Sequence, residues 1–259
     1  MIKTLTAMRY VAPLWQGSSL PAIVEAEDGA LYVMKFLGAG QGSKALIAEL
    51  LAGEIARRLG LPVPEIVLLD LDAELGRLEA HPEISALLGA SEGRNLGLRF
   101  LEGATSYDRL LEPPDAGLAS RIVWFDAYVT NVDRTPRNVN LLLWRQRLWL
   151  IDHGAALYFH HDWKDYLARS RSPFPRVQDH VLLPYARQLA AADAELRPLL
   201  TDDFIARLVA AIPDVWLDER APFSDAAAHR RAYSEYLLAR RDAAPVFVEE
   251  AIRAHAASL

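Results

Sequence analysis

The sequence predicts an α+β protein of two lobes, with an antiparallel sheet and one main helix in the first lobe and mostly helices in the second. Short apolar segments separated by turns fill residues 8–37 and return up to residue 101, which is typical of antiparallel strands. One long amphipathic segment, Ser43 to Leu59, interrupts them. Beyond residue 102, apolar residues recur at helical spacing and prolines separate the segments. We therefore expect an N-terminal lobe over residues 1–101 and a helical C-terminal lobe over residues 102–259.

Composition narrows the class of protein. The chain has 259 residues, of which 52% are hydrophobic and 24% charged, as in ordinary globular proteins. A net charge of −6 argues against a nucleic-acid binder held by bulk electrostatics. The absence of cysteine excludes disulfide scaffolds, thiolate zinc sites and cysteine nucleophiles. No segment has the apolar length of a signal peptide core or a membrane span, so we expect a cytoplasmic protein without a membrane partner.

Three strands are expected at the start of the chain, over Tyr10 to Trp15, Pro21 to Glu25 and Leu31 to Leu37. The first two flank the turn Gln16-Gly-Ser-Ser19, whose backbone N–H groups are free to face an anion. Lys35 lies inside the apolar third strand. A lysine there either projects outward from a sheet edge or points into a cleft toward a fixed anion.

The segment Ser43 to Leu59 predicts an amphipathic helix that Gly60 and Pro62 bring to an end. It carries two acids, Glu49 and Glu54, and either one is a candidate partner for Lys35. The preceding Gly-rich stretch is no Walker phosphate loop, because Ala45 stands where that motif needs a hydroxyl. Two further strands are expected, over Pro64 to Leu71 and Asn95 to Leu101.

In the second lobe we expect helices over Tyr107 to Leu111 and Leu118 to Thr130, then a hairpin of strands Val139 to Leu143 and Leu148 to Ile151 around the turn Arg145 to Arg147. Further helices are expected over residues 162–170, 178–197, 201–212, 224–241 and 244–257.

Asp133 and Asn138 form the pattern D-x-x-x-x-N just before this hairpin, and Asp152 follows it directly. A hairpin returns the chain to its start, so Asp152 is expected near Asn138. Three such oxygen-bearing side chains suit Mg²⁺, which prefers one or two carboxylates plus substrate phosphates. They favour a phosphoryl-transfer site. The alternatives are an ordinary helix cap and turn, or a metal-dependent hydrolase that uses the neighbouring His160-His161 pair.

The predicted parts follow one another in the order of the protein-kinase-like fold. They are a strand, a Gly-containing turn, a second strand, a third strand with a lysine, a helix with an acid, D-x-x-x-x-N, a hairpin and D-x-G. Within that fold the sequence of these motifs resembles HipA-like kinases and, more distantly, phosphoinositide kinases. Three segments carry the likeness: Ala48 to Pro64, which ends in L-G-L-P-V-P, then Asn131-Val-Asp-Arg-Thr-Pro-Arg-Asn138, and Pro173-Phe-Pro-Arg-Val-Gln-Asp-His-Val-Leu183.

The resemblance implies an ATP-dependent kinase with Mg²⁺ as cofactor and a hydroxyl acceptor, either a protein Ser/Thr or a small molecule. Asp133 would act as catalytic base, and Asn138 and Asp152 would hold the metal ion. Lys35 would bind the α- and β-phosphates with Glu49 as its partner, since Glu49 matches the family's acid better than Glu54.

It also implies that Gly17, Ser18 and Ser19 cover the phosphates and that the backbone of Phe100, Leu101 and Glu102 binds adenine. The metal-binding triplet departs from protein kinases, because His153 stands where they usually carry Phe. A pseudokinase that binds nucleotide or a partner without transferring phosphate is the alternative function.

Overall fold

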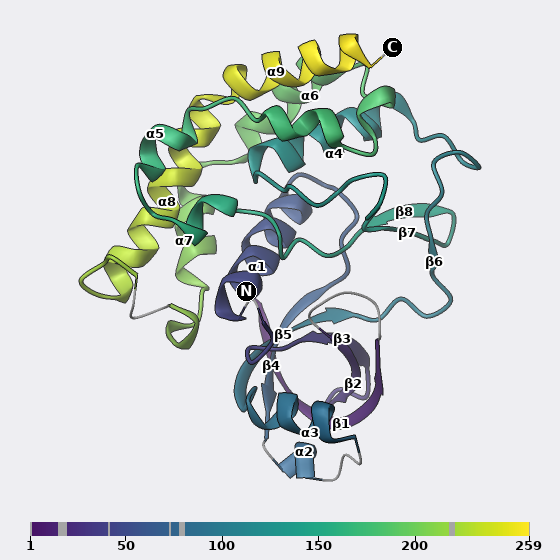
Figure 1. Cartoon of the computed structure of the whole chain (residues 1–259), viewed down its shortest axis with the longest axis vertical. Coiled ribbons are helices and arrows are strands. Elements are labelled where there is room, and N and C mark those ends of the chain that lie inside the picture. The colour runs from purple at the N-terminus through teal and green to yellow at the C-terminus, as the bar shows by residue number, and fades with distance from the viewer. Residues whose placement is uncertain are drawn as a thin grey trace.

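The structure is a computed structural model that describes residues 2–14, 20–40, 42–72, 74–77, 81–217 and 221–258. Figure 1 shows a strongly curved sheet at one end of the molecule and a layered group of helices at the other, with helix α1 between them. The predicted α+β fold is confirmed. The division into lobes at residues 101 and 102 stays a prediction.

Five strands form the N-terminal sheet in the order β1-β2-β3-β5-β4. They are β1 (Lys3–Pro13), β2 (Ala22–Ala26), β3 (Leu31–Lys35), β4 (Ile66–Leu71) and β5 (Gly93–Arg99). Neighbours in this order pair antiparallel, and the start of β1 also pairs in parallel with β4, from Lys3 opposite Val67 to Thr6 opposite Asp70. This extra pairing curls the sheet around a small core that includes Tyr32 and Met34.

The strand β1 begins seven residues before the predicted Tyr10, at Lys3. Its first half alternates only weakly, with Leu5 and Ala7 more buried than the exposed Thr4 and Thr6, so the apolar signal for a strand is small. Backbone pairing with β2 and β4 holds it instead.

Helix α1 (Gly42–Arg58) connects the two parts of the molecule (Figure 1). Ten of its residues are buried, from Leu46 to Ala56, because the sheet covers one side and the helical part another. Gly60, with φ of 72°, ends the helix in the left-handed conformation, and the Leu61 N–H then donates to the Ala56 carbonyl. Two short helices, α2 (Glu74–Arg77) and α3 (Pro82–Gly89), lie at the far end of the sheet.

A small sheet of β6 (Thr105–Ser106), β7 (Leu141–Trp144) and β8 (Arg147–Leu150) follows. The predicted hairpin is confirmed, with Leu141 opposite Leu150. Its turn is one residue shorter than predicted, because Arg145 and Gln146 both adopt positive φ, 49° and 59°, as a two-residue hairpin turn requires.

Helix α4 (Ala116–Tyr128) lies at the centre of the helical part, where Trp124 and Tyr128 stack on each other and contact Phe247. Around it are α5 (Tyr166–Ser170), α6 (Leu189–Leu196), α7 (Asp202–Ala210), α8 (Ala226–Asp242) and α9 (Ala244–Ala257). Single 3₁₀ turns cover Tyr158–His161, Pro175–Asp179, Leu183–Tyr185, Arg197–Leu199 and Asp214–Trp216. No helix in the described ranges is long and apolar enough to cross a membrane.

Two helix predictions in this part were wrong. The segment from Tyr107 to Leu111 forms turns, since the Asp108 side chain accepts from the Leu110 N–H and two prolines follow. The predicted helix over residues 178–197 is α-helical only from Leu189, because Pro184 lacks an N–H and the chain before it is held by His180.

Candidate active site

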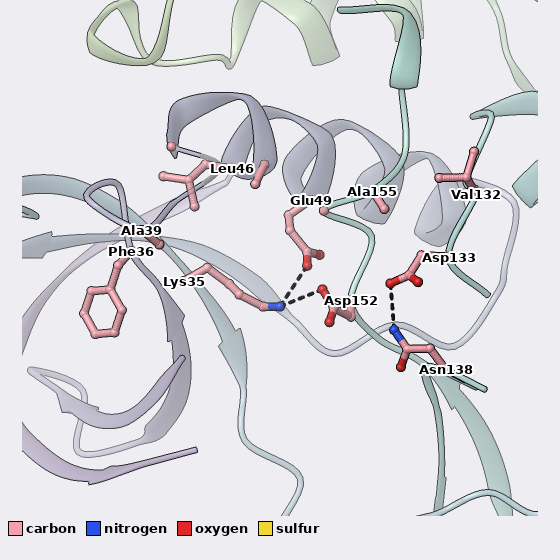
Figure 2. Close-up of a pocket in the computed structure, with 13 residues that line it drawn as sticks. Lys35, Phe36, Ala39, Leu46, Glu49, Val132, Asp133, Asn138, Asp152 and Ala155 are labelled. Atoms are coloured by element: carbon pink, nitrogen blue, oxygen red, sulfur yellow. Dashed lines mark hydrogen bonds and ion pairs between the residues drawn. The ribbon is translucent and has the colours of Figure 1, made fainter. Parts of the chain in front are cut away.

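Lys35 is the last residue of β3 and is paired with Leu96 of β5. Because side chains alternate along a strand, it points away from the sheet core that holds Met34 and toward α1. Its ammonium lies 2.8 Å from Asp152 Oδ1 and 3.3 Å from Glu49 Oε1 (Figure 2). Glu54, the other helix acid, pairs with Arg57 instead. The inward orientation of Lys35 therefore holds, and Glu49 is the acid beside it.

The charges in this group stabilise one another. Burial alone would lower the pKa of Lys35, but the Glu49 and Asp152 carboxylates raise it above its ordinary value. Burial would likewise raise the pKa of Glu49, yet the Lys35 ammonium and His153 hold it well below its ordinary range. Lys35 is therefore a cation and Glu49 an anion across the whole range of ordinary assay pH.

Asp133 and Asn138 lie on the loop that follows α4, on the other side of Asp152 (Figure 2). Asn138 Nδ2 donates to Asp133 Oδ2 over 2.7 Å, and Asn140 Nδ2 approaches the same oxygen at 3.4 Å. Partial burial and the Asp152 carboxylate raise the pKa of Asp133, although the Asn138 hydrogen bond acts against them. This carboxylate is thus a stronger base than an exposed aspartate.

Asp152 lies two residues after the end of β8 and adopts a left-handed backbone conformation, with φ of 56°. The Ile151 N–H donates to the Asn140 carbonyl, so the end of the hairpin is fastened to its beginning. The Asp152 side chain is 42% exposed and faces the pocket, where a ligand can reach it.

One pocket of about 460 Å³ brings these residues together. Its polar wall consists of Lys35, Glu49, Asp133, Asn138 and Asp152, and its apolar wall includes Phe36, Leu46 and Val132. Segments more than a hundred residues apart in the chain thus converge on one cavity.

Phe100, Leu101 and Glu102 do not line the pocket. The Phe100 N–H donates to the Leu31 carbonyl, and the Glu102 carbonyl accepts from the Trp144 indole. The predicted phosphate-covering turn, Gly17, Ser18 and Ser19, lies outside the described residues. Their roles stay predictions.

A buried polar network that the sequence did not predict holds the Asp133 loop. The Arg134 guanidinium lies 2.6 Å from the Asp126 carboxylate of α4, and His180 Nε2 contacts the same carboxylate at 2.9 Å. Asn131 donates to Asp126 and accepts from the Asp133 N–H. The Arg134 guanidinium and the contact with His180 hold the pKa of Asp126 well below its ordinary range despite its burial.

One signal for this network was present in the sequence. Asp126 interrupts the apolar face of a helix, and a buried acid needs a partner. Its partner His180 stands 54 positions away, so the pairing itself could not be identified from the sequence.

His160 and His161 do not form the alternative metal site. His160 Nδ1 lies 3.1 Å from the Tyr233 hydroxyl in the helical core. Over the described ranges, no three His, Cys, Asp or Glu side chains form a group that could hold a metal ion by themselves.

Comparisons with known proteins agree with this geometry. The sequence matches the family of HipA-like kinases over residues 8–247. The crystal structure of the Helicobacter pylori proinflammatory kinase CtkA is similar over 100% of this chain and 99% of that one, with a TM-score of 0.63 and 15% identity. The Golgi casein kinase, solved with Mn and ADP bound, is similar over 98% of this chain and 73% of its own, with a TM-score of 0.52 and 14% identity.

The search of curated proteins found no significant match. At these identities the solved structures establish the fold, which is protein-kinase-like, while the family match covers most of the chain. The chain belongs to the HipA-like kinases and is a phosphotransferase.

Proposed function

We propose that this protein transfers the γ-phosphate of ATP to a hydroxyl acceptor, with Mg²⁺ as its metal ion. The observation that carries the proposal is the single pocket in which Lys35 and Glu49 from the sheet side face Asp133, Asn138 and Asp152 from the helical side. The Golgi casein kinase, which shares the fold, was solved with Mn and ADP. A nucleotide and a divalent cation agree with the charges that line this pocket.

The donor set fits Mg²⁺. Asp152 offers a half-exposed carboxylate, of which Oδ1 meets Lys35, and Asn138 offers an amide oxygen, since its nitrogen is the atom that donates to Asp133. Hard oxygen donors with one carboxylate suit a magnesium ion that also binds phosphates and water. When bound, the ion would neutralise charge on the phosphate chain.

Lys35, Glu49 and Asp133 would each have a separate role in binding and transfer. Lys35, held by Glu49, would bind the α- and β-phosphates and keep the nucleotide in place. Asp133 would orient the acceptor hydroxyl and take its proton as the oxygen bonds to the γ-phosphorus and the bond to ADP breaks. The raised pKa of Asp133 suits this task.

The test compares three proteins in the presence of Mg·ATP: the wild type, Asp133→Asn and Lys35→Ala. Thermal-shift titration measures nucleotide binding. Transfer of labelled phosphate from ATP is measured to an added hydroxyl acceptor, to the protein itself and to water. We expect Asp133→Asn to bind Mg·ATP normally but to transfer phosphate about 10²–10⁴-fold more slowly, because the base is lost. Lys35→Ala should bind Mg·ATP more weakly, because it lacks the phosphate-binding cation.

Asp203→Asn on α7 and the exposed Lys164→Ala are matched controls that repeat these changes away from the pocket. A wild-type protein that binds Mg·ATP and transfers no phosphate to any acceptor, water included, would instead be a pseudokinase. If Mg²⁺ alone produced the whole thermal shift, the nucleotide assignment would be wrong.

A further inference from the structure

A second pocket, of about 720 Å³, lies beside the loop that carries Asp133 and Asn138, which we call the catalytic loop. It shares Val132, Asp133 and Asn138 with the first pocket, whereas Lys35, Glu49 and Asp152 line only the first. The two cavities therefore meet at the residue proposed as catalytic base.

Phosphoryl transfer places the acceptor oxygen and the leaving oxygen roughly in line, on opposite sides of the phosphorus. With the phosphate chain held at Lys35 and Asp152, the acceptor must approach Asp133 from the side that the nucleotide leaves free. The second pocket reaches Asp133 and has none of Lys35, Glu49 and Asp152 in its wall, so it offers an acceptor a way to Asp133 apart from these three residues.

This pocket is lined by three arginines from separate segments. Arg109 precedes α4, Arg137 belongs to the catalytic loop and Arg176 belongs to the turn Pro175–Asp179. The acids in the wall are Asp133 and Asp179, and Asp179 is 3.6 Å from Arg176. Among described residues, the guanidinium groups of Arg109 and Arg137 make no ion pair or hydrogen bond. On a chain of net charge −6, two unpaired guanidinium groups beside the catalytic loop favour an anionic ligand.

Hydrogen bonds anchor two of the segments that carry these arginines, those of Arg137 and Arg176. His180, which lines the pocket, is held by Asp126, and the Val181 N–H donates to the Arg134 carbonyl. The catalytic loop is closed by the Asn138 N–H, which donates to the Thr135 carbonyl. The loop with Arg137 and the segment with Arg176 thus share one buried anchor, which is the preorganisation expected of a binding site.

We propose that this second pocket binds the acceptor, and that the acceptor is a small hydroxyl compound with a phosphate or carboxylate group held by Arg109 and Arg137. The inference rests on the proposed kinase function and specifies its substrate class. A volume of about 720 Å³ suits a small molecule, because such sites typically measure about 300–1,000 Å³. Planar guanidinium groups bind both phosphate and carboxylate in a bidentate manner, so the chemistry that the two share is the anion.

The test fills the nucleotide pocket with Mg·AMPPNP and then measures the binding of matched probes by calorimetry. Glycerol 1-phosphate and glycerate carry the two anions, and glycerol is the neutral analogue. We expect both anionic probes, or one of them, to bind at least 10-fold more tightly than glycerol. The double variant Arg109→Ala/Arg137→Ala should lose at least 10-fold of that affinity, while the exposed Arg171→Ala should not change it.

The preference between the two anionic probes identifies the anion. The inference would be overturned if neither anionic probe bound, if glycerol bound as tightly as both of them, or if the double variant kept the wild-type affinity. An arginine-dependent complex with an acidic Ser-containing peptide that is tighter than either probe complex would replace the small molecule by a protein acceptor. Mg·AMPPNP affinity is measured separately: its absence in the wild type counts against the kinase proposal itself, whereas its presence without anion binding counts against the acceptor pocket alone.

Discussion

His153 connects the metal-binding triplet to α1 through contacts that a phenylalanine could make only in part. Its side chain is fully buried, and its ring packs edge-on against Phe125 with centroids 5.7 Å apart, as an aromatic ring of either kind would. Its Nδ1 also lies 3.5 Å from Glu49 Oε2, the oxygen that does not face Lys35. His153 thus adds a polar contact between Glu49 and the chain next to Asp152. We regard it as a positioning residue.

The variant His153→Phe tests this contact, because it keeps the ring against Phe125 and removes Nδ1. Glu49 Oε2 then loses a polar neighbour 3.5 Å away in a buried place, which is expected to cost about 1 kcal/mol of stability or less and to let Lys35 shift away from the phosphates. We expect the KM for Mg·ATP to rise more than kcat falls, with His153→Asn, which offers an amide N–H near the position of Nδ1, recovering part of the loss. Steady-state kinetics and urea unfolding measure both effects. Identical KM values for wild type and His153→Phe would contradict the role.

At the scale of elements, Arg240 of α8 holds the end of helix α4, from which the catalytic loop departs. Its buried guanidinium donates to the carbonyls of Ala127 and Tyr128 in the last turn of α4 and to those of Ser170, the last residue of α5, and Ser172 just after it. It also lies over the Phe247 ring, 4.6 Å from the centroid. A cation at the C-terminal end of a helix is favourable, and this one satisfies carbonyls that the helix cannot pair itself.

Arg240→Met should therefore lower the free energy of unfolding by about 3–5 kcal/mol, because several buried carbonyls lose their donor at about 1–3 kcal/mol each. Arg240→Lys should recover little, since one ammonium cannot reach carbonyls on two separate segments. The matched control is Arg231→Met, which makes the same substitution at an exposed position of the same helix. It should change stability by less than about 0.5 kcal/mol. Urea unfolding followed by circular dichroism measures all three. A loss below 1 kcal/mol for Arg240→Met would show that α4 does not depend on this contact.

The elements that could be predicted are those with a local physical signal. The hairpin around Arg145 and the helix ended by Gly60 follow from apolar periodicity and turn chemistry within a few residues. The pairing of β1 with β4 could not be predicted, because it joins segments 64 positions apart through backbone bonds, and Leu5 and Ala7 alone give this part of β1 a weak apolar pattern.

The same division applies to the site. Lys35, Asp133, Asn138 and Asp152 were found because each lies at a recognisable point of an element, and their order in the chain matches a known family. Arg240 and His180 were not found, because their partners are distant in sequence and their roles depend on the packing of several elements.

At the scale of the whole molecule, His160 lies where the start of α1, the segment after the metal-binding triplet and α8 come together. It is fully buried, with Nδ1 3.1 Å from the hydroxyl of Tyr233 on α8. Burial, together with the nearby His161, Lys44 and His229, lowers the pKa of His160 well below its ordinary value. The folded protein therefore keeps this ring neutral at pH values where the unfolded chain protonates it.

This difference in proton binding predicts how stability depends on pH. Because the unfolded chain takes up a proton at His160 near pH 6.5 and the folded protein does not, acidification favours the unfolded state, and the contribution of His160 is complete only above that pH. Between pH 7.5 and pH 5.5 the wild type should lose about 1 kcal/mol more unfolding free energy than His160→Gln or His160→Phe, neither of which titrates. Urea unfolding at the two pH values gives the loss within each protein, so any constant cost of the substitution cancels. Equal losses in all three proteins would mean that the ring can be protonated in place, through rearrangement of the contacts that α1 and α8 make around it.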